Sequence, residues 1–267
     1  MTTTTASRAG QRTIGELLRG WREQRRLSQL ELALQAEVST RHLSFVETGR
    51  ASPSRELVLH LAEQLDVPLR ERNYLLLAAG YAPVYQQSAL DSPYMNSVRE
   101  ALREILVAHE PNPAVVVDRY WNIVDANTSI GIFTEDVADF LLRPPINVLR
   151  LSLHPQGVAP RIVNLGQWRG HLLARLRREV AHTADPELAR LEDELREYPC
   201  EPPERVVEVP GPNDVAVPLI FRYADQELRF ISTVAAFGTP LDITVAELAI
   251  ELFFPADSST AGVLRAR

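Results

Sequence analysis

The chain has 267 residues, and its 45% hydrophobic and 24% charged residues are ordinary for a soluble protein with a buried core. No stretch approaches the roughly 18 consecutive apolar residues of a membrane span, and the polar N-terminus lacks a signal-peptide core. The single cysteine, Cys200, excludes an internal disulfide and a multi-cysteine metal site. We therefore expect a cytoplasmic protein with no membrane partner, and we treat residues 1–12 as a disordered tail.

The net charge of -7 is unevenly distributed along the chain. The first 80 residues carry 11 arginines and 9 acidic residues, whereas the remainder carries 17 and 26. Basic side chains gather in one short stretch, residues 39–56: Arg41, His42, Arg50 and Arg55. This stretch is either an ordinary solvated surface or one local basic site in an otherwise acidic protein.

Residues 13–80 show the periodicity of five short helices. In the first, apolar residues repeat at helical spacing and the arginines are expected on the surface; these arginines are Arg19, Arg22, Arg25 and Arg26. A second helix is expected to open at Ser28, because Ser28 and Glu31 are spaced as a capping box. Ser39 is a candidate N-cap for a third helix that ends near Gly49. The fourth is expected to start at Pro53 and Ser54, and the fifth to stop at Gly80.

The second and third helices are separated by a short turn. This is the helix-turn-helix arrangement, which docks its second helix in the major groove of DNA. The stretch "LSQLELALQAEVSTRHLSFVETGR" resembles the helix-turn-helix of the XRE (Cro/C1-type) family over residues 13–80. Glu37 departs from that family's pattern, because many members have glycine at this turn. A left-handed residue other than glycine there implies mild backbone strain.

The resemblance implies a set of DNA contacts. It places Gln29 beside the DNA backbone and Ser39 at the start of the reading helix. On the outer face of that helix it places Thr40, Arg41, Ser44 and Phe45. Arg41 is suited to pair with a guanine edge, and Phe45 either packs on a thymine methyl or is buried against the fourth helix. Arg50 is expected to contact phosphate, as are Arg12 and Arg55.

Residues 81–93, "YAPVYQQSALDSP", lack periodicity and are expected to form a linker. A connector helix is predicted for residues 94–110, followed by a hairpin with strands at 114–117 and 122–126. Helical patterns fill the middle, including residues 165–181 and 186–198. Strands are predicted at 216–223 and 227–237. The last apolar run, 243–254, fits either a strand or a helix.

This order predicts an α+β domain at residues 94–257, with an antiparallel sheet and helices that cover a cavity, as in PAS-like domains, and a C-terminal tail at 258–267. The phrases "RYWNIVDAN", "NVLRLSLHP", "WRGHLLARLRREV" and "TVAELAIELFFP" resemble the MmyB-like transcription regulators. That resemblance implies a small amphipathic ligand of fatty-acid type, with no other cofactor.

A buried acyl chain needs an apolar cavity and polar groups that meet its carboxylate. Arg150 lies in an apolar segment and is the first candidate; the alternative is an ion pair with Asp125 or Asp136. Further candidates for hydrogen bonds to the ligand are Asn127, Asn147, Tyr120 and His154. For Asn127 and Asn147, capping of strand and helix ends is the competing interpretation. Aromatic candidates for the cavity wall are Trp121, Phe133 and Trp168, with plain core packing as the alternative.

The sequence has no phosphate loop, nucleophile elbow or zinc-protease motif, so we expect neither an enzyme nor a metal site. A single histidine in the cavity that ligates haem is the remaining cofactor hypothesis. We predict a bacterial, nucleoid-associated regulator that binds double-stranded operator DNA as a homodimer and responds to a small ligand. The alternative is a DNA-binding regulator whose second domain is a ligand-free dimerisation or protein-interaction module.

Overall fold

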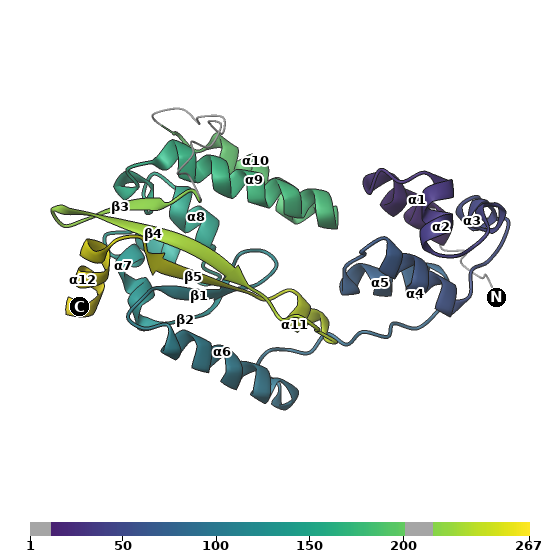
Figure 1. The fold of residues 1–267 in the computed structure, drawn as a ribbon, viewed down its shortest axis with the longest axis horizontal. Helices are drawn as coiled ribbons and strands as arrows, with labels where there is room; N and C mark the ends of the chain where they lie inside the picture. Colours follow the sequence, from purple (N-terminus) through teal and green to yellow (C-terminus); the bar gives the residue numbers. More distant parts are fainter. Residues whose placement is uncertain (1–11, 201–215) are drawn as a thin grey trace, which may run out of the picture. The chain divides into compact units, whose positions relative to one another are not determined.

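The computed structural model describes residues 12–200 and 216–267 (Figure 1). The predicted tail at residues 1–12 therefore lies almost wholly outside the described residues. The chain folds as two units, of which the first holds residues 1–87 with 241–243 and the second holds 88–240 with 244–267. Residues 81–87, predicted as linker, belong to the first unit, where the Tyr81 hydroxyl donates to the Pro53 carbonyl (3.0 Å).

The first unit consists of five helices, as the periodicity predicts. They are α1 (Ile14–Gln24), α2 (Gln29–Gln35), α3 (Thr40–Glu47), α4 (Arg55–Gln64) and α5 (Leu69–Ala78). The predicted caps are confirmed: Ser28 and Glu31 form the capping box of α2, Ser39 caps α3 and Ser54 caps α4. Each cap satisfies an amide that the first helical turn leaves without a partner.

One apolar core holds these helices together, and the close packing of α1 on α3 depends on a glycine. The residues of this core include Leu18, Leu32, Leu43, Val46 and Leu61. A Cβ atom at Gly15 would lie 2.5 Å from the Val46 carbonyl oxygen, which no real Cβ tolerates. Glycine at this position therefore lets the two helix backbones approach each other.

The turn between α2 and α3 adopts the left-handed conformation that the sequence predicts. Glu37 has a φ of 52°, a region in which side chains other than glycine are strained. The end of α3 also turns left-handed, at Gly49 with a φ of 73°, where glycine carries no such strain. Glutamate rather than glycine at position 37 therefore makes this turn slightly less stable.

The second unit is an α+β domain with a five-stranded antiparallel sheet. Its strands are β1 (Ala114–Val117), β2 (Ile123–Ala126), β3 (Leu219–Tyr223), β4 (Gln226–Ala235) and β5 (Ala249–Pro255). The strand order is β2-β1-β5-β4-β3, so the final strand lies in the centre and joins the first hairpin to the β3–β4 hairpin. The helices are α6 (Asn96–Ala108), α7 (Gly131–Thr134), α8 (Val148–Leu153), α9 (Leu165–Thr183), α10 (Pro186–Glu197), α11 (Ile243–Ala246) and α12 (Ser258–Ala266). Four 3-10 turns join them: Pro93–Met95, Thr128–Ile130, Asp139–Leu142 and Ala159–Arg161.

The two faces of the sheet carry separate cores. Alternate residues of a strand point to opposite faces, so Val116 and Ile250 pack with Leu102 and Leu106 of α6. Val115 and Phe253 face the other way, toward the larger core that α7, α8, α9 and α10 cover. Figure 1 shows α6 below the sheet and α8 to α10 above it.

Two features of the C-terminal region differ from or refine the sequence prediction. The apolar run 243–254, which periodicity leaves ambiguous, divides into the short helix α11 and the central strand β5. The expectation of a tail at 258–267 is wrong, because residues 258–266 form helix α12. Asp257 caps this helix and its Leu264 is buried in the larger core. A helix of nine residues is too short for its periodicity to distinguish it from a polar tail.

Candidate functional site: a reading helix and a ligand cavity

Helix α3 is fixed against the first unit by one face and leaves the other open. The Ser39 hydroxyl accepts from the His42 amide (3.1 Å), and Leu43 and Val46 are buried. At helical spacing this leaves Thr40 and Arg41 exposed. The predicted residues Thr40, Arg41, Ser44 and Phe45 thus lie together on the outward side of the second helix of the pair.

Phe45 lies between two arginines at the end of α3. Its ring is half-buried, and the guanidinium carbons of Arg41 and Arg50 lie 5.3 and 5.9 Å from the ring centre. Such cation–π contacts orient a guanidinium without neutralising its charge. Arg41 and Arg50 are exposed, as are Arg12 and Arg55. Arg41, Phe45 and Arg50 therefore form one basic, partly aromatic cluster at the end of α3, whereas Arg12 and Arg55 are exposed arginines elsewhere in the same unit.

A buried ion pair locks α1 to this helix, which corrects the expectation that Arg22 lies on the surface. Arg22 is 8% exposed, and its Nε and Nη2 atoms donate to the two carboxylate oxygens of Glu47 at 2.7 and 2.9 Å. These hydrogen bonds raise the pKa of Arg22. Gln29 also donates to Glu47 (2.8 Å), so part of its amide is used inside the protein rather than left for DNA.

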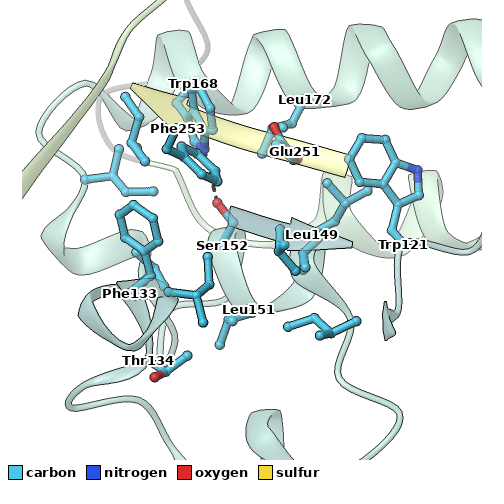
Figure 2. A pocket seen from close by; sticks show the side chains of 17 residues that line it. Trp121, Phe133, Thr134, Leu149, Leu151, Ser152, Trp168, Leu172, Glu251 and Phe253 are labelled. Carbon is cyan, nitrogen blue, oxygen red and sulfur yellow. Dashed lines mark hydrogen bonds between the residues drawn. The ribbon is translucent and has the colours of Figure 1, made fainter. Parts of the chain in front are cut away.

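The second unit contains a cavity of about 70 Å³ between the sheet and helices α7, α8 and α9 (Figure 2). Its wall is almost entirely apolar, with Val115, Ile123, Ile130, Leu149, Leu151, Val158, Ile162, Leu172, Leu219 and Phe253 among the lining residues. The aromatic residues predicted for this role, Trp121, Phe133 and Trp168, also line it. An apolar wall of this kind suits an aliphatic or aromatic group.

Polar contacts along the cavity tie its walls together. The Trp168 indole donates from Nε1 to Ser152 Oγ (3.1 Å), which links α9 to α8 across the cavity (Figure 2). Trp168 also stacks on His171, with ring centres 5.7 Å apart. Burial, together with nearby Arg175 and Arg178, lowers the pKa of His171. The neutral imidazole is thus favoured behind the aromatic wall.

Arg150 does not line the cavity. Its Nε and Nη2 atoms donate to Glu194 at 2.8 and 2.7 Å, and its side chain is 42% exposed. The apolar residues around it in sequence lie on the buried side of α8, so Arg150 itself points to the outer side. An ion pair was the alternative interpretation, but the partner is Glu194 on α10 rather than Asp125 or Asp136.

The two asparagines predicted to bind ligand serve the backbone instead. The side-chain oxygen of Asn147 accepts from the Leu149 and Arg150 amides (both 3.1 Å) and so caps α8. Asn127 accepts from the Ala114 amide (2.9 Å) and donates to the Asn112 carbonyl (2.7 Å). Both are buried with their hydrogen bonds satisfied, which matches the capping interpretation.

The remaining two candidates also lie off the cavity wall. Tyr120 packs under the guanidinium of Arg119, and its hydroxyl donates to Asp185 (3.4 Å). The imidazole of His154 lies edge-on between Phe140 and Tyr198, with ring centres 5.3 and 5.0 Å away. Neither residue is among those that line the cavity.

Among the described residues, sequence reasoning missed the one charged residue of the cavity wall, Glu251 on β5. It is 5% exposed and occupies an inward position of the strand, two residues before Phe253. Arg175 Nη1 lies 3.6 Å from its carboxylate, and Ser232 donates a hydrogen bond to it. Burial raises the pKa of Glu251. The available signal was an acid inside the apolar run "AELAIELFFP".

No helix in residues 12–200 or 216–267 is long and apolar enough to cross a membrane. Within the same part of the chain, no three residues among His, Cys, Asp and Glu are grouped so that they could hold a metal ion.

Comparison with known families covers both units. Residues 18–72 match a helix-turn-helix family, and residues 98–266 match the MmyB-like transcription regulator ligand binding domain. The reading helix, the α+β domain and these matches define a DNA-binding transcription regulator with a ligand-binding domain. The chain belongs to the MmyB-like transcription regulators. No curated protein matches the chain.

Proposed function

We propose that the protein is a sequence-specific DNA-binding regulator, not an enzyme, whose second unit binds a small amphipathic ligand that changes its affinity for an operator. The observation that carries this proposal is the apolar cavity of the ligand-binding domain, present in the same chain as the exposed basic face of α3. The strand order β2-β1-β5-β4-β3, with helices inserted between β2 and β3, supports the PAS-like interpretation of that domain.

The cavity supports a ligand with a fatty-acid-like body. Its wall offers aliphatic and aromatic side chains to an alkyl chain. Its volume of about 70 Å³ is well below the roughly 300–1,000 Å³ of typical ligand sites. A long-chain ligand must therefore displace part of the wall. We infer that Trp168 moves, because its indole spans the cavity from α9 to Ser152 on α8 and so occupies space that a long chain needs.

The displacement of Trp168 couples ligand binding to a change in the conformation of the second unit. A ligand shifts a conformational equilibrium only by its difference in affinity for the two states. Widening the cavity changes the packing of α8 and α9 on the sheet, so a ligand favours the widened arrangement. We propose that this change in packing alters how the DNA-binding units are positioned on the operator.

We further propose that the protein acts as a homodimer on a two-fold symmetric operator. One reading helix covers only a few base pairs, and paired half-sites are the usual solution. We place this contact on the side of the connector helix α6 that carries Ile105, which is 36% exposed, together with Tyr94 just before the helix, which is 89% exposed. Val107 is two residues further along α6 and therefore lies on a different side of the helix. Light scattering that gives a monomer mass with and without operator DNA would contradict this part of the proposal.

The ligand proposal is tested by extraction and by a matched pair of variants. Native mass spectrometry of the purified protein, followed by organic extraction, is expected to reveal an amphiphile at about one per chain. In a thermal-shift assay over alkanoates of increasing length, the wild type is expected to be stabilised. Val148→Phe fills the cavity and should abolish that stabilisation, whereas Val107→Phe makes the same change on the exposed face of α6 and should retain it.

The small volume of the cavity also supports a second candidate function. In this alternative the second unit is a ligand-free dimerisation or protein-interaction module with a filled core. It predicts a protein mass with nothing bound, no thermal shift at any chain length, and equal behaviour of Val148→Phe and Val107→Phe apart from stability. The DNA-binding assignment is unaffected by this choice.

A further inference from the structure

Glu251 places a carboxyl group in the wall of a cavity that is otherwise almost entirely apolar. Of the described residues that line the cavity, it is the one that carries a charged group, and it is 5% exposed. The alternation of β5 puts it on the same face as Phe253, between the sheet and α9. Figure 2 shows it beside Leu172, at the end of the cavity marked by Trp121.

The groups around Glu251 leave it incompletely neutralised. Arg175 of α9 is 3.6 Å from Glu251, but its Nε atom is also 3.6 Å from Glu179 of the same helix. The guanidinium lies 4.2 Å from the ring centre of Trp121, whose Nε1 donates to Glu179 (2.8 Å). From β4, Ser232 donates to Glu251. One arginine thus serves both the buried Glu251 and the partly exposed Glu179, whose side chain is 36% exposed.

An ionised ligand carboxylate would add a third negative charge to this group. Two carboxylates that share a dry site cannot both ionise freely, so one of them retains a proton. Burial already raises the pKa of both Glu251 and Glu179, which favours a proton at this end of the cavity. A polar group that donates a hydrogen bond meets no such repulsion.

We propose that the polar end of the ligand binds at Glu251 through a shared proton, so that the site accepts hydrogen-bond donors and takes a fatty acid only together with one proton. This inference rests on the proposed ligand-binding function and specifies the chemistry of its head-group site. An alkanol donates its own hydroxyl hydrogen to the carboxylate. A fatty acid and Glu251 hold one proton between the two carboxyl groups.

The consequence is a difference in pH dependence between two ligands with the same tail. Binding that takes up one proton weakens about tenfold for each pH unit once both carboxyl groups are ionised in the free state. The affinity for decanoate should therefore fall steeply over the pH range in which Glu251 loses its proton, which burial places above the ordinary range of a glutamate. The affinity for decanol should stay nearly constant, because no proton is taken up.

The experiment measures the affinity of the full chain for decanoate and decanol across this pH range by calorimetry. In Glu251→Gln, the amide keeps the shape of the side chain and donates from its nitrogen. This variant should bind decanoate with little pH dependence, and at high pH more tightly than the wild type. Glu104→Gln makes the same change on the exposed side of α6 and should behave as wild type.

The outcomes separate this inference from the proposed function. Decanol binding by each variant shows that its cavity is folded and open. The inference is overturned if wild-type affinity for decanoate is the same at both ends of the pH range, or if Glu251→Gln keeps the wild-type slope. If neither amphiphile binds at any pH, the proposed ligand-binding function itself is wrong, and this inference fails with it.

Discussion

The ion pair between Arg22 and Glu47 makes a strong prediction about the stability of the DNA-binding unit. The Glu47 side chain is 1% exposed, and its carboxylate accepts two hydrogen bonds from Arg22 and one from Gln29. Glu47→Gln leaves the Arg22 guanidinium buried without its counter-charge. Removing one partner of a buried pair costs about 3–5 kcal/mol. That is a large part of the roughly 5–15 kcal/mol that stabilises a typical domain.

Urea unfolding followed by circular dichroism measures this cost. With a slope of about 1–3 kcal/mol per molar urea, the midpoint of the affected transition should fall by at least ~1 M. The matched control is Glu23→Gln, because Glu23 is 53% exposed, pairs with Arg19 across one helical turn at 2.7 Å and approaches Arg22 no closer than 3.9 Å. Exposed pairs of this kind are worth about 0.3–0.5 kcal/mol. Equal midpoints for the two variants would refute the claim that the buried pair locks α1 to α3.

Three further predictions concern the reading helix, its turn and the cavity acid. Arg41→Ala should cost about 1–3 kcal/mol of binding free energy for the operator. Arg50→Ala should weaken binding to all DNA sequences alike and reduce the slope of log K against log salt concentration by about 0.9. Binding titrations at several salt concentrations measure both effects. Glu37→Gly should raise stability by up to about 1 kcal/mol, because it relieves a φ of 52°; a loss in urea unfolding would contradict the strain argument. Burial raises the pKa of Glu251, so its contribution to stability is full below its ordinary pKa of about 4.3 and is lost as the pH rises through the folded value. Relative to Glu251→Gln, the wild type should therefore lose up to about 1.4 kcal/mol per pH unit in that window, and parallel stability curves would contradict this.

The helices and strands followed from local signals in the sequence. The capping serines Ser28, Ser39 and Ser54 fix helix starts because a cap acts within one turn. The apolar run of β1 predicted a strand, whereas the run that contains β5 fitted either a strand or a helix, so its inward positions could not be assigned from the sequence. These signals also led to Trp121, Phe133 and Trp168, since large aromatic side chains near buried strands line whatever space the core encloses.

The polar partners could not be predicted in this way. Arg22 is paired with a residue 25 positions away, and Arg150 with one 44 positions away. Periodicity shows which face of a helix is apolar, but not which distant acid meets an arginine beside that face. Arg150 was chosen for its apolar neighbours in sequence; those neighbours are buried, whereas the Arg150 side chain is 42% exposed and meets Glu194 of α10. Glu251 escaped notice because an acid in a strand usually faces solvent.

In the proposed function, a ligand in the second unit and DNA at the first influence each other's binding. The direct test is the affinity of a bound alkyl ligand measured with and without saturating operator DNA, the operator having been selected from random sequence. Because coupling is reciprocal, a ligand that changes operator affinity must itself bind with a different affinity when DNA is present. Coupling between the two sites should change the ligand affinity by about fivefold or more, which is the size of typical allosteric coupling. Equal ligand affinities in the two conditions would contradict it.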